Sequence, residues 1–183
     1  GEYKAGSYDS DSFILVTLGT GVGGGIILGG KLITGVNNAA GEIGHMTIDM
    51  DGEPCGCGKN GCFESYGSAS ALIRHAREAT GENITEAKEV FDRAAAGEKI
   101  FAQILEDYTT HLAVGLANLI NIFGPAYICI GGGVSLAGDA LLQPVREKTY
   151  AMMYAKAAQR KPQIILAKLC NDAGILGAAW LEE

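Results

Sequence analysis

Hydrophobic residues near both ends of the chain gather into short apolar runs that predict β-strands. Phe13–Leu18 is a largely apolar run with the length of a buried strand. Ile26–Ile33 is predicted to form a β-hairpin, because Gly29 and Gly30 can supply the positive φ angles of a two-residue turn. Tyr127–Ile130 is predicted as a further short buried strand.

The region between these strands has the longer period of amphipathic helices. Helices are predicted over residues 64–79, 85–96, 98–123 and 139–156, and a last helix begins near Asp172. In the third of them, apolar side chains recur at steps of three and four, which is typical of a face packed in a core. These side chains are Phe101, Ile104, Leu105, Tyr108, Leu112, Leu116, Leu119, Ile120 and Phe123.

One histidine and three cysteines carry the most specific chemical signal. His45, Cys55, Cys57 and Cys62 have the spacing H-x9-C-x-C-x4-C, which is typical of a structural zinc site with three thiolates and one imidazole. Glycines between the cysteines allow the backbone to fold tightly around an ion. The alternative is a disulfide or three unrelated buried thiols. The remaining histidines, His75 and His111, lie on predicted helices and are expected to be surface or helix-packing residues.

Two carboxylates, Glu42 and Glu64, flank the four metal-ligand candidates. Ionised carboxylates accept several O–H bonds at once, so they suit the hydroxyls of a neutral polyol better than a phosphate. The alternative is that Glu42 caps a turn and that Glu64 begins a helix, where the helix dipole favours an acid.

Glycines make up five of the seven residues from Gly19 to Gly25, and such a run brings backbone N–H groups close to a ligand. The run fits G-x-G-x-x-G, yet a strand follows it rather than a helix, which excludes the dinucleotide fingerprint. No Gly-Lys-Ser/Thr closes it, which excludes a P-loop. We interpret the run as a phosphate cradle to which Thr20 adds a hydroxyl. A tight hairpin with a bulge is the alternative.

A second glycine cluster, Gly131, Gly132 and Gly133, ends the strand at Ile130 and precedes a helix. Ligands of α/β folds bind at such carboxyl ends of strands. The triplet would let a nucleotide base or ribose lie flat on the backbone. It also suits a close strand-to-helix connection without a ligand.

Composition limits the class of protein. The chain has 183 residues, of which 48% are hydrophobic and 27 are glycine, as expected for one soluble α/β domain with its own core. A net charge of −7 argues against nucleic acid or an anionic membrane as a direct partner. Cys129 and Cys170 are interpreted as buried structural thiols. Since no disulfide is then required, a cytoplasmic location fits.

Five segments of the chain together resemble the ROK family (repressors, open reading frames, sugar kinases), with the greatest likeness to bacterial ATP-dependent glucokinases. They are residues 18–25, 41–45, 55–64, 130–133 and 173–179. The resemblance implies an α/β fold of the actin/hexokinase type (ribonuclease H-like), with a zinc-binding loop inserted over residues 42–64.

The resemblance also implies a site for each ligand. Structural zinc would bind His45, Cys55, Cys57 and Cys62, and sugar hydroxyls would bind Glu42, His45 and Glu64. The phosphates of ATP, with its Mg²⁺, would lie at Gly19, Thr20 and Gly21, and the adenosine near Gly131, Gly132 and Gly133. The implied reaction is phosphorylation of a hexose, glucose to glucose 6-phosphate.

The family's Asp-x-Gly-Gly-Thr loop and its catalytic Asp, in an Asn-Asp-Ala segment, are not matched in this chain. Its only Asn-Asp-Ala, residues 171–173, begins a predicted helix, so Asp172 is not assigned as the base. Residues 1–183 are therefore expected to be the carboxy-terminal lobe of a kinase whose amino-terminal lobe is absent here. No catalytic residue is expected in this chain, which is predicted to be inactive alone.

Other readings remain open. The family includes sugar-responsive repressors, in which the same lobe follows a helix-turn-helix, and a zinc-stapled sugar-binding module without chemistry is a further alternative. Among kinases, N-acetylglucosamine, N-acetylmannosamine and fructose compete with glucose as the substrate. The full-length protein is expected to form a homodimer or homotetramer.

Overall fold

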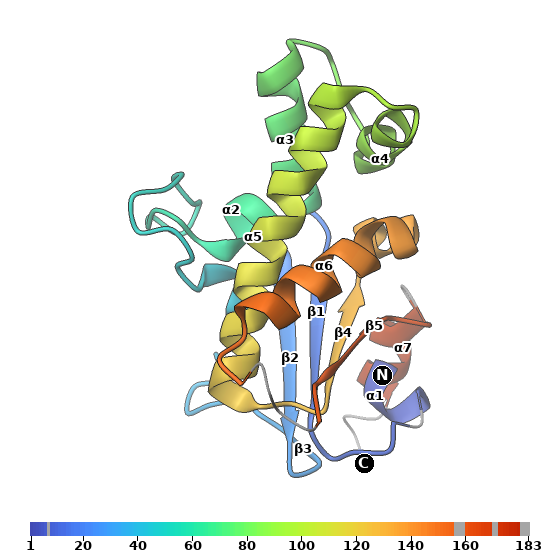
Figure 1. Cartoon of the computed structure of the whole chain (residues 1–183). Helices are drawn as coiled ribbons and strands as arrows, with labels where there is room; N and C mark the ends of the chain where they lie inside the picture. The colour runs from blue at the N-terminus through green and yellow to red at the C-terminus, as the bar shows by residue number, and fades with distance from the viewer. Residues whose placement is uncertain (7, 156–159, 170–171, 180–183) are drawn as a thin grey trace.

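A mixed β-sheet forms the centre of the computed structural model, which describes residues 1–6, 8–155, 160–169 and 172–179 (Figure 1). Within these residues the strands lie in the order β3-β2-β1-β4-β5. Their bounds are β1 Phe13–Leu18, β2 Val22–Leu28, β3 Lys31–Leu32, β4 Tyr127–Gly131 and β5 Gln163–Leu166. β2 is antiparallel to β1 and β3, whereas β4 is parallel to β1 and β5. The predicted strands and the α/β class are confirmed.

The second strand begins earlier than predicted. Leu18 pairs with Val22, so Gly19–Gly21 alone form the turn between β1 and β2, and Gly23–Gly25 belong to β2. A residue without a side chain is needed at Gly24, because the segment that contains Gly41 approaches β2 closely. A Cβ on Gly24 would lie only 2.5 Å from the carbonyl oxygen of Gly41.

The helical regions agree with the prediction apart from α1, which was not predicted, and from three boundaries that differ by two residues or more. The helices are α1 Glu2–Ala5, α2 Phe63–Gly67, α3 Ala69–Thr80, α4 Ala87–Ala95, α5 Lys99–Phe123, α6 Asp139–Met152 and α7 Asp172–Ala179, with 3₁₀ turns η1 Ile43–His45 and η2 Gly133–Ala137. The single helix predicted over 64–79 is wrong, because Ser68 is extended and its side chain caps α3 by accepting from the N–H of Ala71. Helix α4 begins two residues later than predicted, and α6 ends at Met152 rather than at residue 156.

Helices α5 and α6 cross one face of the sheet (Figure 1). That face of β1 presents Ile14, Val16 and Leu18, which are fully buried against the predicted stripe of α5. Tyr108 adds a hydrogen bond between α5 and α2, in which its hydroxyl donates to the carbonyl of Gly67 at 2.8 Å. The core therefore lies between the sheet and these two helices.

The amino-terminal segment lies on the opposite face. The ring of Tyr8 packs on Phe13 at a centroid distance of 4.8 Å. The buried carboxylate of Glu2 accepts N–H bonds from Lys168 and Leu169, at 3.0 and 3.1 Å, and a bond from the Tyr8 hydroxyl. Cys129, on β4, is buried as predicted, while Cys170 lies outside the described residues.

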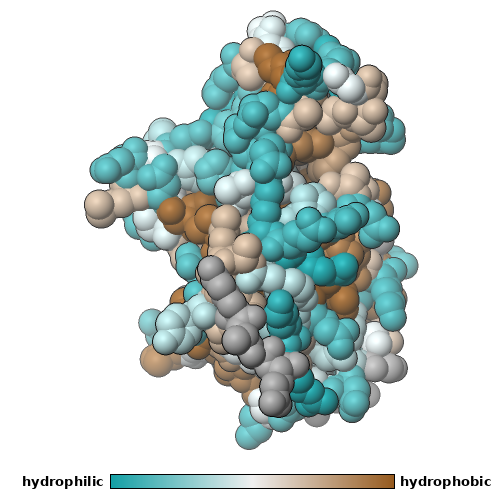
Figure 2. All heavy atoms as spheres, in the orientation of Figure 1, coloured by the Kyte–Doolittle hydropathy of each residue, from teal (hydrophilic) through white to brown (hydrophobic). Residues whose placement is uncertain are grey.

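One of several apolar patches on the surface lies near the β2–β3 end of the sheet, at the lower left of Figure 2. The large apolar side chains exposed along this segment are Leu32, Ile33 and Val36. Among the described residues, no helix combines the length and apolar character needed to cross a bilayer.

Candidate functional site

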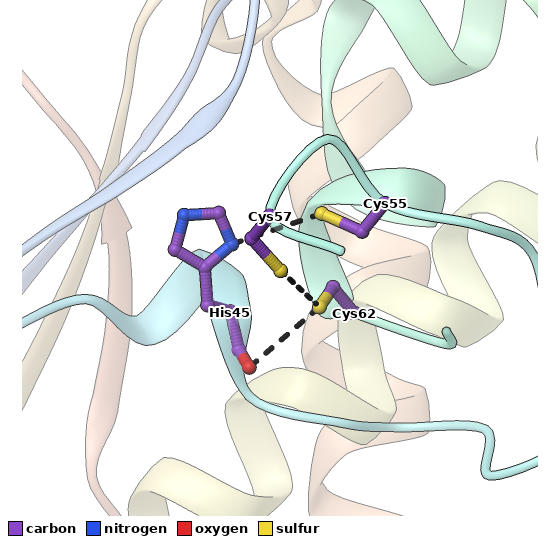
Figure 3. A group of neighbouring side chains, drawn as sticks. All are labelled: His45, Cys55, Cys57 and Cys62. Carbon is purple, nitrogen blue, oxygen red and sulfur yellow. Dashed lines mark hydrogen bonds between the residues drawn. The ribbon is translucent and has the colours of Figure 1, made fainter. Parts of the chain in front are cut away.

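The four metal-ligand candidates meet beside α2 (Figure 3). His45 ends η1, Cys62 directly precedes α2, and Cys55 and Cys57 lie on the loop between them. The four potential ligand atoms all lie within 4.8 Å of one another. The structure therefore brings together residues that are up to 17 positions apart in the sequence.

The spacing of the cluster fits a tetrahedral ion. Cys57 Sγ and Cys62 Sγ are 3.5 Å apart, and His45 Nδ1 is 3.8 Å from Cys55 Sγ. A tetrahedral zinc about 2.3 Å from each sulfur would separate the sulfurs by about 3.8 Å. All three cysteines are free, so the disulfide alternative is wrong for this structure.

The sulfur atoms differ strongly in their affinity for protons. Burial raises the pKa of the Cys62 thiol to about 12, whereas a hydrogen bond from the backbone of Lys59 lowers the pKa of the exposed Cys57. A bound cation would replace these protons and stabilise all three thiolates together.

Several contacts that the sequence does not reveal hold the loop in place. The ammonium of Lys59 donates to the carbonyl of His45 at 2.8 Å, and the backbone N–H of Glu53 donates to the hydroxyl of Tyr66 at 2.7 Å. The Glu53 carboxylate accepts from His75 Nε2 at 2.8 Å and from Arg74. No local sequence signal identifies these partners, because the bonds depend on how the loop folds back on itself and on how it packs against α2 and α3.

The second candidate group is a carboxylate that touches the glycine turn. Glu64 lies in the first turn of α2, and its Oε2 accepts the backbone N–H of Val22 at 3.0 Å. A Cβ on Gly21 would collide with the same oxygen, so glycine is required for this approach. Glu42 is the exposed N-cap residue of η1, and its side chain makes no capping hydrogen bond.

The segment that carries Glu42 and His45 packs along β2. A Cβ on Gly44 would collide with the carbonyl oxygen of Val22, just as Gly24 lies against Gly41. The backbone from 41 to 45 therefore rests on the first residues after the turn. This packing places both sugar-binding candidates of η1 next to the predicted phosphate cradle.

The two glycine clusters lie side by side, because β1 and β4 are parallel neighbours. Thr17 pairs with Gly131, and a Cβ on Gly132 would collide with the carbonyl oxygen of Leu18. Gly132 has a φ of 86°, a conformation that favours glycine. The candidate nucleotide residues thus share one edge of the sheet, at the carboxyl ends of these two strands.

Known proteins are similar to this chain in sequence. A glucokinase of Halalkalibacterium halodurans is 39% identical over 99% of this chain and 59% of its own length. An N-acetylmannosamine kinase of Shigella boydii is 35% identical over all of this chain and 60% of its own length. A putative xylose repressor of Caldicellulosiruptor is 30% identical over 97% of this chain and 47% of its own length. The chain thus spans about three-fifths or less of these relatives.

A solved structure supports the same assignment. A ROK family glucokinase from Streptomyces griseus, in complex with glucose and AMPPNP, superposes with a TM-score of 0.89 and 35% identity, covering 98% of this chain and 63% of that one. The mixed α/β sheet is therefore the fold of ROK kinase structures. The model of the ROK family matches residues 1–183, and this chain therefore belongs to the ROK family.

Proposed function

We propose that the full-length protein containing this chain transfers a phosphoryl group from Mg·ATP to a hydroxyl of a hexose, with glucose as the first candidate. Residues 1–183 would form its carboxy-terminal lobe. The hydrogen bond between Glu64 and Val22 carries this proposal, because it joins a sugar-binding candidate to the predicted phosphate cradle. The similar Streptomyces griseus enzyme, whose complex contains glucose and AMPPNP, adds support.

Each group would act mainly by positioning. Glu42 and Glu64 accept hydrogen bonds from sugar hydroxyls, and His45, with the ion on Nδ1, donates its Nε2–H to a sugar oxygen. The backbone N–H groups of Thr20 and Gly21 would donate to the phosphates, whereas the N–H of Gly19 donates to the carbonyl of Gly21 at 3.0 Å. Gly131–Gly133 offer a flat backbone surface to the adenosine. A loose phosphoryl-transfer transition state asks the protein chiefly for such positioning and for charge stabilisation.

The base that takes the hydroxyl proton is proposed to lie outside these 183 residues, in the amino-terminal lobe. Asp172, in the first turn of α7, is not assigned this role. The chain by itself is accordingly expected to be inactive. Cytoplasmic location and assembly into a homodimer or homotetramer belong to the same proposal for the full-length protein.

Zinc is proposed to occupy the His45–Cys55–Cys57–Cys62 cluster in a structural role. His45 turns Nδ1 toward the sulfur atoms, and its other ring nitrogen points away from them (Figure 3). That second nitrogen is free to face the sugar, and an ion on Nδ1 would fix its tautomer. The ion would thus stabilise the loop and orient the imidazole.

A sugar-sensing repressor is the second candidate function, favoured by the similarity to the putative xylose repressor. The residues that precede this lobe in the full-length protein decide between the two. A helix-turn-helix there would indicate a regulator, whereas a phosphate-loop strand would indicate a kinase. A chain that lacks the expected Asp in that lobe would be a sugar-binding module without chemistry.

A coupled assay of ADP release tests the proposal on the full-length protein. Glucose, N-acetylmannosamine, N-acetylglucosamine and fructose are compared as substrates, with the isolated 183-residue chain as a parallel sample. We expect hexose-dependent turnover by the full-length protein only. A full-length protein that releases no ADP with any of the four sugars is not a kinase for them, and turnover by the isolated chain would place the base within it.

The variant Glu64→Gln tests the role of this carboxylate in the same assay. The amide keeps an oxygen that can accept the N–H of Val22, but it accepts sugar hydroxyls more weakly than a charged carboxylate. We expect the KM for the hexose to rise by about tenfold or more, with little change in the KM for ATP. Unchanged hexose kinetics would mean that Glu64 only begins a helix.

A further inference from the structure

We infer that Gly21 and the backbone N–H of Val22 are positioning groups for the sugar-binding carboxylate of Glu64, so that the glycine turn sets affinity for the sugar as well as for the nucleotide. The inference rests on the proposed function of Glu64. It gives the turn a role in sugar binding, which its glycine-rich sequence alone does not indicate.

The first observation is that one oxygen of the Glu64 carboxylate is already hydrogen-bonded to the turn. Glu64 Oε2 accepts the Val22 N–H at 3.0 Å, and a carboxylate has a second oxygen of equal basicity. With Oε2 engaged by the turn, Oε1 is the oxygen that a sugar hydroxyl would use. The bond to Val22 therefore selects one orientation of the carboxylate plane.

The second observation is that Glu64 has no room to retain this orientation beside a larger residue 21. A Cβ on Gly21 would collide with Oε2 and would lie 3.0 Å from Cδ. The backbone of Glu64 cannot retreat easily, because the preceding Phe63 is fully buried and its N–H donates to the carbonyl of Met46 at 2.8 Å. A methyl group at position 21 should therefore rotate the carboxylate away.

The third observation is that the turn is fixed from its other side. The carbonyl of Gly19 accepts the N–H of Ala69, the first residue of α3, at 2.8 Å. Gly44 packs against the carbonyl of Val22. The turn, Glu64 and the η1 segment thus form one packed unit, so a shift of the turn cannot leave the carboxylate in place.

The experiment measures hexose affinity by calorimetry without nucleotide, on the full-length protein and with the hexose that the wild type phosphorylates best among the four. For Gly21→Ala we expect a Kd about tenfold or more above that of the wild type, with the zinc content retained. Gly174→Ala is the control in α7, where a Cβ would meet nothing within 4 Å. Its Kd should stay within about twofold of the wild type.

A double-mutant cycle with Glu64→Ala separates positioning from a general loss of structure. If Gly21 acts through Glu64, the variant G21A/E64A should match E64A in Kd within about twofold, because the methyl group then has no carboxylate to displace. Melting temperatures should follow the same pattern: G21A lowers that of the wild type but not that of the E64A protein. This second comparison decides the matter even if G21A alone folds poorly.

Three outcomes would count against the inference. Normal hexose affinity of G21A, beside a wild type that binds and phosphorylates the sugar, overturns it and leaves the proposed function intact. Additive effects of G21A and E64A, on affinity or on melting temperature, overturn it as well. A wild type that neither binds nor phosphorylates any of the four hexoses overturns the proposed function, and the inference with it.

Discussion

Protonation of the half-buried His111 side chain opposes folding. Its Nδ1 atom is buried without a hydrogen-bond partner among the described residues, and its ring stacks on Tyr66 at a centroid distance of 4.5 Å. Burial lowers the pKa of His111, and the charge of nearby His75 lowers it further, against smaller opposing effects of Asp107 and Glu53. The prediction that His111 is a surface or helix-packing residue agrees with this environment.

The variant His111→Phe should remove part of the acid sensitivity of the protein. Because the pKa of His111 is lower in the folded state, the unfolded state binds the extra proton as pH falls below about 6.5, and stability decreases. Phenylalanine keeps the stack on Tyr66 and cannot be protonated. We expect urea unfolding to show equal or higher stability of the variant at pH 7.5 and a smaller loss toward pH 5.

Comparing the two proteins at each pH cancels acid effects on the metal cluster, provided that both contain the same amount of zinc. Equal losses of stability between pH 7.5 and 5 in both proteins would contradict this account of His111.

Single residues also show which contacts the sequence predicts and which it does not. The spacing from His45 to Cys62 indicated the cluster correctly, because nearby ligands need only a short loop to meet. The bond from Val22 to Glu64 joins residues 42 positions apart, and it depends on how α2 packs against the sheet. Metal and sugar binding themselves stay predictions.

At the scale of elements, the break between α2 and α3 was not predicted, because apolar spacing continues through it. The cause of the break is a tertiary contact. Ser68 leaves the helical conformation, and the N–H of Ala69 is then free to donate to the carbonyl of Gly19. Helix α6 ends early for a similar reason, since the N–H of Tyr154 donates to the side chain of Asn121 at 2.9 Å.

Local packing predicts opposite effects for two helical glycines, one at the contact between α2 and α5 and one on α7. A Cβ on Gly115 of α5 would lie 2.5 Å from ring atoms of the buried Phe63, whereas a Cβ on Gly174 of α7 would meet nothing within 4 Å. Overpacking costs about 1–3 kcal/mol, against a gain in helix propensity of about 1 kcal/mol for either substitution. We expect Gly115→Ala to lower the free energy of unfolding in urea and Gly174→Ala to maintain or raise it. Stabilisation by Gly115→Ala would mean that Phe63 can move.

The loop over residues 42–64 should depend on its metal. We expect elemental analysis to find about one zinc per chain, and a chelator to lower the melting temperature, because structural zinc contributes folding free energy directly. Cys57→Ser should reproduce the chelated state. The control is Cys129→Ala, which removes a buried thiol of β4 outside the cluster and should leave the zinc content unchanged. An absence of zinc from protein purified without chelator would contradict the prediction.

At the scale of the whole molecule, the α/β class was predicted, but the order of the strands was not. Short apolar runs identify strands without identifying their partners. The long helical region between β1 and β4 permits their parallel pairing, since parallel neighbours need a crossover connection, but it does not by itself determine that pairing. The match to ROK kinase structures confirms the resulting fold.

The central position of β1 has a consequence for the order of events during synthesis. On one side β1 pairs with β2, its neighbour in sequence, but on the other side Phe13 pairs with Tyr127. The hairpin and the ligand loop close over short distances in the chain, whereas closing the loop to β4 costs more entropy and takes longer. We expect pulsed hydrogen exchange during refolding to protect the amides of β2 before those of β4, and simultaneous protection would contradict this order. Until β4 is made, the apolar edge of β1 stays unpaired, and a ribosome that pauses within α5 would expose it to other nascent chains.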